Sequence, residues 1–254
     1  ACGFQKESSR IFNKYFIDSH FKSLLVNYYG RRYSRILKYE NIKILVLTEF
    51  HKAFLKKLKI EENKIFVLPN FIDIDKSIRK LNDDLFIIYA GRVSEEKGVE
   101  ELIKTYLNLK DKKFKLKIAG EGPELNYLKT KYIDENVEFL GYIKNDKVLD
   151  LISQSIGVVT ATKLYEGQPT ILCEASSIGV ASIFPRSGGI SEFFPIDYKL
   201  SFEQFNYDDL LIKLNLMNDE NNIRKQGNLV KKYISNYLEK QKLISKFEKV
   251  LDEF

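Results

Sequence analysis

Two glutamates, Glu166 and Glu174, stand eight positions apart and enclose a segment that begins Gly167-Gln168-Pro169. An ionised carboxylate only accepts hydrogen bonds, so each can hold two sugar hydroxyls. The same charge repels a phosphate at contact but suits a polyol beside one. The alternative interpretation is an exposed loop residue and a helix-surface residue.

The residues between these glutamates predict the start of a helix. Pro169 suits the first helical position and Gly179 the end. The amides of Thr170, Ile171 and Leu172 are then expected to be free and to form an anion cradle at the positive end of the helix dipole. The whole segment indicates a ligand with a phosphate in its middle and polyols at either end, which is the layout of a sugar nucleotide.

A second segment, from Gly91 to Gly98, places Arg92 and Lys97 after an apolar run. Two cations at a strand end could bind a phosphate, although surface cations are more often only solvated. Two further glycine-containing loops follow apolar runs, at 119–123 and 187–192. Each could admit a ligand to the backbone or simply form a tight turn.

The elements that must position these loops alternate in type. Apolar runs typical of buried strands lie at 85–91, 114–120, 137–141, 156–161 and 181–184. Amphipathic helical runs lie at 97–109, 123–132, 146–155 and 169–178. This alternation predicts an α/β fold with a doubly wound parallel sheet, whose ligands bind beyond the carboxyl ends of the strands.

The flanking segments are shorter or more polar. Strands are predicted at 42–48 and 64–73, with a helix at 49–58 between them. A linker is expected at 76–84 and a helical tail from about 206 to 254.

Composition sets the class. The chain has 254 residues, of which 44% are hydrophobic and 30% charged, so it is long enough to bury a core and is not disordered. Two distant cysteines, Cys2 and Cys173, favour a reducing cytoplasm over a disulfide framework. Two histidines, His20 and His51, cannot build a histidine-rich metal centre, and neither is assigned a catalytic role.

The basic excess belongs to the first third of the chain. Residues 1–80 hold 17 basic and 8 acidic side chains, whereas the remainder has a net charge of −3. This excess fits either a solvated lysine-rich surface or contact with anionic lipid. Nucleic-acid binding is disfavoured, because the sequence has no recognition motif and no phosphate-binding G-x4-GK[ST] loop.

Five motifs in order resemble the large retaining GT-B-fold glycosyltransferase family with the E-x7-E signature (group 1, family 4). They are AGR-x4-KG at 90–98, AGEGP at 119–123, FLGY at 139–142, the glutamate pair Glu166 and Glu174, and SGGISE at 187–192. The segment 46–73 resembles the end of the family's N-terminal domain and the crossover to the second domain. The phrase at 166–195 is similar to bacterial capsule and exopolysaccharide transferases.

The resemblance implies roles for individual residues. Arg92 and Lys97 would bind the donor diphosphate, Glu166 would contact the donor sugar near the reacting face, and Glu174 would bind the ribose. Glu166, Arg92 and Lys97 are thereby the expected catalytic residues. The expected donor-binding set is Gly91, Arg92, Lys97, Gly122, Leu140, Glu166, Gly167, Gln168, Pro169, Thr170, Ile171, Leu172 and Glu174.

The resemblance further implies the reaction and the domains. A sugar would pass with retention from a UDP- or GDP-sugar to a lipid-linked or oligosaccharide acceptor of bacterial surface polysaccharide, without a metal. Residues 1–80 would be the end of the acceptor-side domain with the interdomain linker, 81–235 the donor domain and 236–254 a closing helix. The sequence is therefore expected to be a fragment. The alternative is the nucleotide-binding half of a two-chain transferase.

Overall fold

A computed structural model describes residues 20–39, 41–72 and 84–252. The chain divides after Leu68 into two compact units, which are described separately. The predicted linker at 76–84 lies outside the described residues, except for Asp84. Within the described ranges, none of the helices combines the length and the apolar character needed to cross a bilayer.

The first unit contains a long helix and a small parallel strand pair. Its elements are α2 (His20–Tyr39), β1 (Ile44–Val46), α3 (Glu49–Lys57), the 3-10 turn η1 (Glu62–Lys64) and β2 (Ile65–Val67). The strands and helix predicted at 42–48, 49–58 and 64–73 are confirmed in shorter form. The Thr48 hydroxyl accepts a hydrogen bond from the amide of His51 at 3.2 Å and caps α3, so His51 lies in the first turn of the helix predicted at 49–58.

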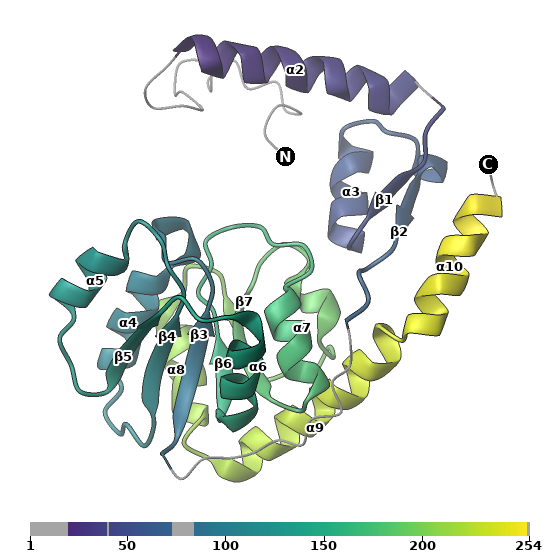
Figure 1. Ribbon diagram of the computed structural model, residues 1–254. Coiled ribbons are helices and arrows are strands. Elements are labelled where there is room, and N and C mark those ends of the chain that lie inside the picture. Colours follow the sequence, from purple (N-terminus) through teal and green to yellow (C-terminus); the bar gives the residue numbers. More distant parts are fainter. Residues whose placement is uncertain (1–19, 40, 73–83, 253–254) are drawn as a thin grey trace. The chain divides into compact units, whose positions relative to one another are not determined.

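The second unit is built on six parallel strands in the order β5-β4-β3-β6-β7-β8 (Figure 1). The strands are β3 (Phe86–Ala90), β4 (Lys115–Ala119), β5 (Val137–Gly141), β6 (Gly157–Val159), β7 (Ala181–Arg186) and β8 (Ser201–Glu203). Strands β3 and β6 are neighbours in the sheet but not consecutive in the chain, so the connections change direction between them. The predicted doubly wound sheet is confirmed.

The central strands are apolar because both of their faces are buried. Phe86, Ile87 and Ile88 of β3 have no exposed surface, and Leu116 and Ile118 of β4 are equally enclosed. Each such side chain contributes about 1.5–3 kcal/mol by leaving water. Strand β8 was not predicted, since only Phe202 of its three residues is buried and the pattern shows no alternation long enough to recognise.

Helices cover both faces of this sheet (Figure 1). The helices of the second unit are α4 (Val99–Leu107), α5 (Leu125–Lys131), α6 (Asn145–Gln154), α7 (Thr170–Ser177), α8 (Tyr207–Leu216), α9 (Glu220–Tyr237) and α10 (Lys240–Asp252). Helix α4 packs against α8, whereas α7 packs against α6 and α9. The helical tail is confirmed. The helix predicted at 97–109 begins only at Val99, because Gly98, with φ +66°, separates it from the 3-10 turn η2 (Glu95–Lys97).

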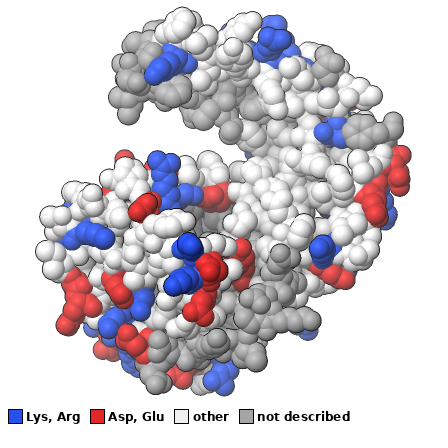
Figure 2. Space-filling model, viewed as in Figure 1, with Lys and Arg blue, Asp and Glu red and all other residues white. Residues whose placement is uncertain are grey.

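Charges of both signs lie side by side over the face of the second unit in view (Figure 2). Several are paired, as in Lys131 with Glu100 at 2.7 Å and Lys163 with Glu101 at 2.8 Å. This mixture agrees with the small net charge of residues 81–254. Among the described residues, the only cysteine is Cys173, which is free and buried in α7.

Candidate active site

Two adjoining cavities open at the carboxyl ends of β3 and β6. The first has a volume of about 170 Å³ and the second of about 660 Å³, which lies within the ~300–1,000 Å³ of small-molecule sites. Ala90, Gly91, Thr170 and Ile171 line both cavities, so these residues form the junction between them. The site therefore occupies the point where the sheet changes winding direction, as expected for a doubly wound fold.

The start of α7 forms one wall of the junction. Pro169 precedes the helix as its N-cap, one residue before the predicted position. Its carbonyl accepts the amides of Leu172 and Cys173, both at 3.0 Å. The Leu172 amide is therefore not free, which corrects the prediction, because it makes a 3-10-type hydrogen bond to the Pro169 carbonyl in the first turn of the helix. Within the described residues, the amides of Thr170 and Ile171 have no acceptor and remain available to a ligand.

The far end of α7 follows the prediction for Gly179. This residue has φ +81°, and its amide donates to the Ser176 carbonyl at 3.0 Å. The Val180 amide donates to the Ala175 carbonyl at 2.9 Å. These two bonds define a Schellman motif, which ends the helix where glycine tolerates the left-handed backbone.

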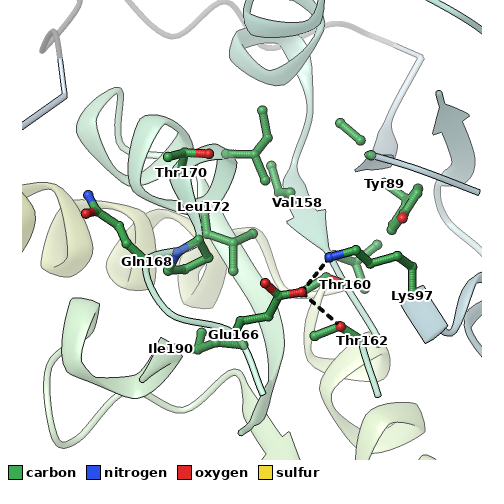
Figure 3. Close-up of a pocket in the computed structure, with 15 residues that line it drawn as sticks. Tyr89, Lys97, Val158, Thr160, Thr162, Glu166, Gln168, Thr170, Leu172 and Ile190 are labelled. Atoms are coloured by element: carbon green, nitrogen blue, oxygen red, sulfur yellow. Dashed lines mark hydrogen bonds and ion pairs between the residues drawn. The ribbon is translucent and has the colours of Figure 1, made fainter. Parts of the chain in front are cut away.

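Lys97 and Glu166 meet in the first cavity, although 69 residues separate them (Figure 3). The Lys97 Nζ donates to Glu166 Oε1 at 2.5 Å, and the Thr162 hydroxyl donates to the same oxygen at 3.1 Å. Both charged side chains keep over a quarter of their surface exposed, 29% and 27%. A cation and a carboxylate thus lie within reach of one ligand.

Contacts between loops hold this pair in position. The Lys163 amide donates to the Glu96 carbonyl at 2.9 Å and ties the loop after β6 to η2. On the other side, the Gly189 amide donates to the Glu166 carbonyl at 2.8 Å. The loop at 187–192 therefore supports Glu166, and Ile190 of this loop lines the first cavity.

Arg92 and Glu174 both line the second cavity. Arg92 is exposed, and the Tyr89 hydroxyl donates to its carbonyl at 2.7 Å, which fixes the turn after β3. Burial raises the pKa of Tyr89, and the charges of Glu166 and Glu96 add to the effect, so the hydroxyl stays a donor. Burial also raises the pKa of the half-buried Glu174 carboxyl.

The loop at 119–123 contains glycines for a reason other than ligand access. A Cβ on Gly120 would overlap the Gly91 carbonyl oxygen, and one on Gly122 would overlap that of Val93. The two loops are joined by the Val93 amide, which donates to the Glu121 carbonyl at 2.8 Å. Gly122 lines neither cavity, whereas Gly120 and Glu121 line the second.

The loop after β5 also differs in detail from the expectation. Leu140 lines neither cavity, but Tyr142 and Ile143, which follow it, line the second together with Asn145 and Val148. Leu140 belongs to β5, whose side chains stand over the sheet rather than beyond its end. The FLGY motif pointed to the correct loop, and the strand end at Gly141 decides which residues reach the cavity.

Gln168 makes a contact that the sequence did not reveal. Its side-chain amide donates to the Asn70 carbonyl at 2.8 Å, and its Oε1 accepts the Asn70 amide at 2.7 Å. Gln168 also lines the first cavity, as do the unpredicted Tyr89, Thr160 and Thr162. Gly167 lines neither cavity. Among the residues that the structure describes, no three His, Cys, Asp or Glu side chains gather closely enough to hold a metal ion.

Comparison with known proteins identifies relatives of this chain. A family model described as glycosyl transferases group 1 matches residues 70–237. The gpi3 subunit of phosphatidylinositol N-acetylglucosaminyltransferase from Schizosaccharomyces pombe is 31% identical over 134 residues, which are 50% of this chain and 29% of that protein. The amylovoran biosynthesis glycosyltransferase AmsD of Erwinia amylovora is 28% identical over 111 residues, 40% of this chain and 31% of that protein.

The fold has a solved counterpart. A point mutant of S. aureus TarM, crystallised with fondaparinux, alpha-GlcNAc-glycerol and UDP, superposes with a TM-score of 0.76 at 22% identity. The superposition covers 87% of this chain and 46% of that one. The likeness shows a GT-B glycosyltransferase fold. The matches to the two curated relatives span less than a third of their length.

Proposed function

This chain belongs to the glycosyl transferases group 1 family, and we propose that it transfers a sugar from a nucleotide-sugar donor, such as a UDP- or GDP-sugar, to an acceptor hydroxyl with retention. One observation carries the proposal. Two cavities, each with a glutamate in its wall, adjoin at a junction formed by Gly91 and the open amides of Thr170 and Ile171. An anion site between two polyol sites matches the donor's layout.

The donor is proposed to lie across this junction. The sugar would occupy the first cavity beside Glu166, and the nucleoside the second, with its ribose on Glu174. The diphosphate would accept the amides of Thr170 and Ile171 at the start of α7. The volumes support this order, because a nucleoside is larger than a single sugar and the second cavity is the larger of the two.

The proposed chemistry follows from the leaving group. The bond from the anomeric carbon to the β-phosphate oxygen breaks, and a bond from that carbon to the acceptor oxygen forms on the same face. The acceptor proton passes to the departing phosphate. Lys97, Arg92 and the start of α7 would stabilise the negative charge that develops on the phosphate. Because these groups supply positive charge, we propose that no metal is needed.

The acceptor is proposed to be a lipid-linked or oligosaccharide chain of a bacterial surface polysaccharide. The name of AmsD, which refers to amylovoran biosynthesis, supports this class. Helix α2 carries five basic and no acidic side chains and exposes several aromatic rings, Tyr28, Tyr29 and Tyr33 among them. These features support the proposal that the chain is cytoplasmic and lies peripherally on the inner face of an anionic membrane.

A second candidate is a nucleotide-binding half of a two-chain transferase. One observation favours it: the described residues that line the two cavities all belong to the second unit. Donor binding could therefore be complete in a chain that needs a partner for turnover. If the chain alone binds UDP and also hydrolyses a UDP-sugar or transfers its sugar, this candidate is rejected. If the chain binds UDP but shows neither activity, this candidate is favoured.

The test of the proposal is nucleotide binding by calorimetry. UDP or GDP is expected to bind the chain and to raise its melting temperature. Lys97→Ala should weaken this binding, because a charge-assisted contact to a phosphate is worth about 1.5–3 kcal/mol, or roughly tenfold or more in Kd. Lys163→Ala is the matched control, since Lys163 lies in neither cavity. If neither nucleotide binds, the donor assignment is wrong.

A further inference from the structure

The ion pair of Lys97 and Glu166 joins two groups that the proposed function gives to different parts of one ligand. Lys97 is to hold a phosphate, and Glu166 is to hold sugar hydroxyls. In this structure Glu166 Oε1 instead accepts Lys97 Nζ at 2.5 Å (Figure 3). We propose that Glu166 competes with the diphosphate for Lys97 and thereby promotes release of the nucleoside diphosphate product. This inference rests on the proposed function.

The pair is built to re-form whenever the ligand leaves. Both partners are anchored through the backbone. Next to Lys97, the Glu96 carbonyl accepts a hydrogen bond from the Lys163 amide, and the carbonyl of Glu166 itself accepts one from the Gly189 amide. Gly98, next to Lys97, packs so closely on Ala161 that a Cβ would overlap the Ala161 carbonyl oxygen. Only the two side chains therefore need to move when a ligand binds.

The third group at this position is Thr162, which donates to the same Glu166 oxygen at 3.1 Å. A hydroxyl and an ammonium thus share one carboxylate oxygen. When the donor is bound, sugar hydroxyls can take the place of the ammonium as donors to Glu166, and Lys97 is free for the phosphate. Each charge then has a partner in the complex.

The balance changes once the sugar has been transferred. Glu166 loses the sugar hydroxyls, while the diphosphate still holds Lys97. The carboxylate then lies near a phosphate without a partner of opposite charge, which is unfavourable at close range. Return of Lys97 to Glu166 relieves this state and weakens the contact that holds the product. A carboxylate at position 166 should therefore make the empty site bind UDP less tightly than a neutral side chain would.

The experiment compares UDP binding by calorimetry in the whole chain and in Glu166→Gln. The variant keeps the shape of the side chain and removes its charge. It is expected to bind UDP about fivefold more tightly, which is the upper value for a partly exposed ion pair. Glu101→Gln is the matched control. Glu101 pairs with Lys163 at 2.8 Å with similar side-chain exposure, 21% and 25%, and lies in neither cavity. Its UDP affinity should stay within twofold of the unchanged chain, a change well below the fivefold gain expected for Glu166→Gln.

Lys97→Met separates competition for Lys97 from simple repulsion of phosphate. Adding Glu166→Gln to this variant should raise its UDP affinity by clearly less than fivefold, since the cation for which the two anions compete is gone and only repulsion between the carboxylate and the phosphate remains. Equal or weaker UDP binding by Glu166→Gln alone would overturn the inference while UDP binding by the unchanged chain upholds the proposed function. An equal gain in the presence and absence of Lys97 would also overturn it. If neither UDP nor GDP binds the unchanged chain, both proposals fail.

Discussion

Two residues of the same type, Glu166 and Glu174, have different surroundings at opposite ends of the site. Glu166 accepts hydrogen bonds from Lys97 and Thr162. Glu174 is half-buried in α7, and burial raises the pKa of its carboxyl. A raised pKa in the folded state means that stability is greatest below the unfolded value, near 4.5, and is lost as pH rises through the folded pKa. At neutral pH the charge of Glu174 therefore destabilises the fold.

Glu174→Gln should therefore stabilise the fold at neutral pH and weaken UDP binding. At pH 7 the variant is expected to unfold at a higher urea concentration than the unchanged chain, and this gain should disappear below pH 4.5, where both side chains are neutral. Its affinity for UDP should fall about tenfold, because a hydrogen bond to a charged acceptor is lost. Inorganic pyrophosphate, which has no ribose, serves as the control ligand. If pyrophosphate and UDP lose affinity equally, the ribose assignment is wrong.

At the scale of elements, the site depends on loops that hold one another. Gln168 is the clearest case, because its side-chain amide pairs with both backbone groups of Asn70, 98 residues away. The side-chain amide of Gln168 thus pairs with the backbone of Asn70 in the way that a residue on a neighbouring strand would, by one donated and one accepted hydrogen bond. In the same segment, Lys240 of α10 lies 5.0 Å from the centre of the Phe71 ring. The segment that opens the second unit is fastened at two points.

Gln168→Ala should release this segment. The Asn70 amide loses its acceptor, and a net loss of about 1 kcal/mol corresponds to roughly fivefold faster hydrogen exchange if exchange occurs through local opening. Exchange of residues 69–72 can be followed by mass spectrometry of peptides or by NMR. Gln154→Ala is the control, since Gln154 bonds only within α6, to Asp150 at 2.9 Å. Unchanged exchange at Asn70 would contradict the assigned bond.

At the scale of the whole molecule, the segment around α2 differs in charge from the rest of the chain and exposes several aromatic side chains. Residues 81–254 have a net charge of −3, and both signs are mixed over the face of the second unit in view (Figure 2), whereas α2 has five basic and no acidic side chains. Tyr39, Phe21 and Tyr29 of α2 are 81%, 69% and 62% exposed. Tyrosine and cations together are typical of helices that lie at a membrane surface.

Binding to vesicles tests this reading of α2. The chain should sediment with vesicles that contain phosphatidylserine and not with phosphatidylcholine alone, and salt should weaken the binding. Replacing Arg31, Arg32 and Arg35 by Gln should lower the partition coefficient about 100-fold, at ~1 kcal/mol per cation. The exposed lysines Lys110, Lys129 and Lys246, replaced together, provide a control with the same change of charge. Equal losses in the two triple variants would reject a role specific to α2.

The sequence by itself determined the order of the elements and the loops that carry the site. Buried parallel strands are apolar on both faces, so β3, β4 and β6 are recognisable as short apolar runs, and the helices between them are amphipathic. Their alternation requires a parallel sheet, and a parallel sheet brings the loops after its strands to one edge. Glu166 and Lys97 could therefore be assigned to one site without coordinates.

Only the tertiary structure decided which atoms meet there. Lys97 pairs with Glu166 across 69 residues, and Gln168 with Asn70 across 98. No local pattern encodes such distances, because they depend on how far each strand extends and on how its loop packs on the next. The hydrogen bond from the Leu172 amide to the Pro169 carbonyl, which removes that amide from the site, has the same origin, and so does the presence of Tyr142 instead of Leu140 in the cavity wall. Local sequence sets the type of an element, whereas its exact end depends on packing between elements.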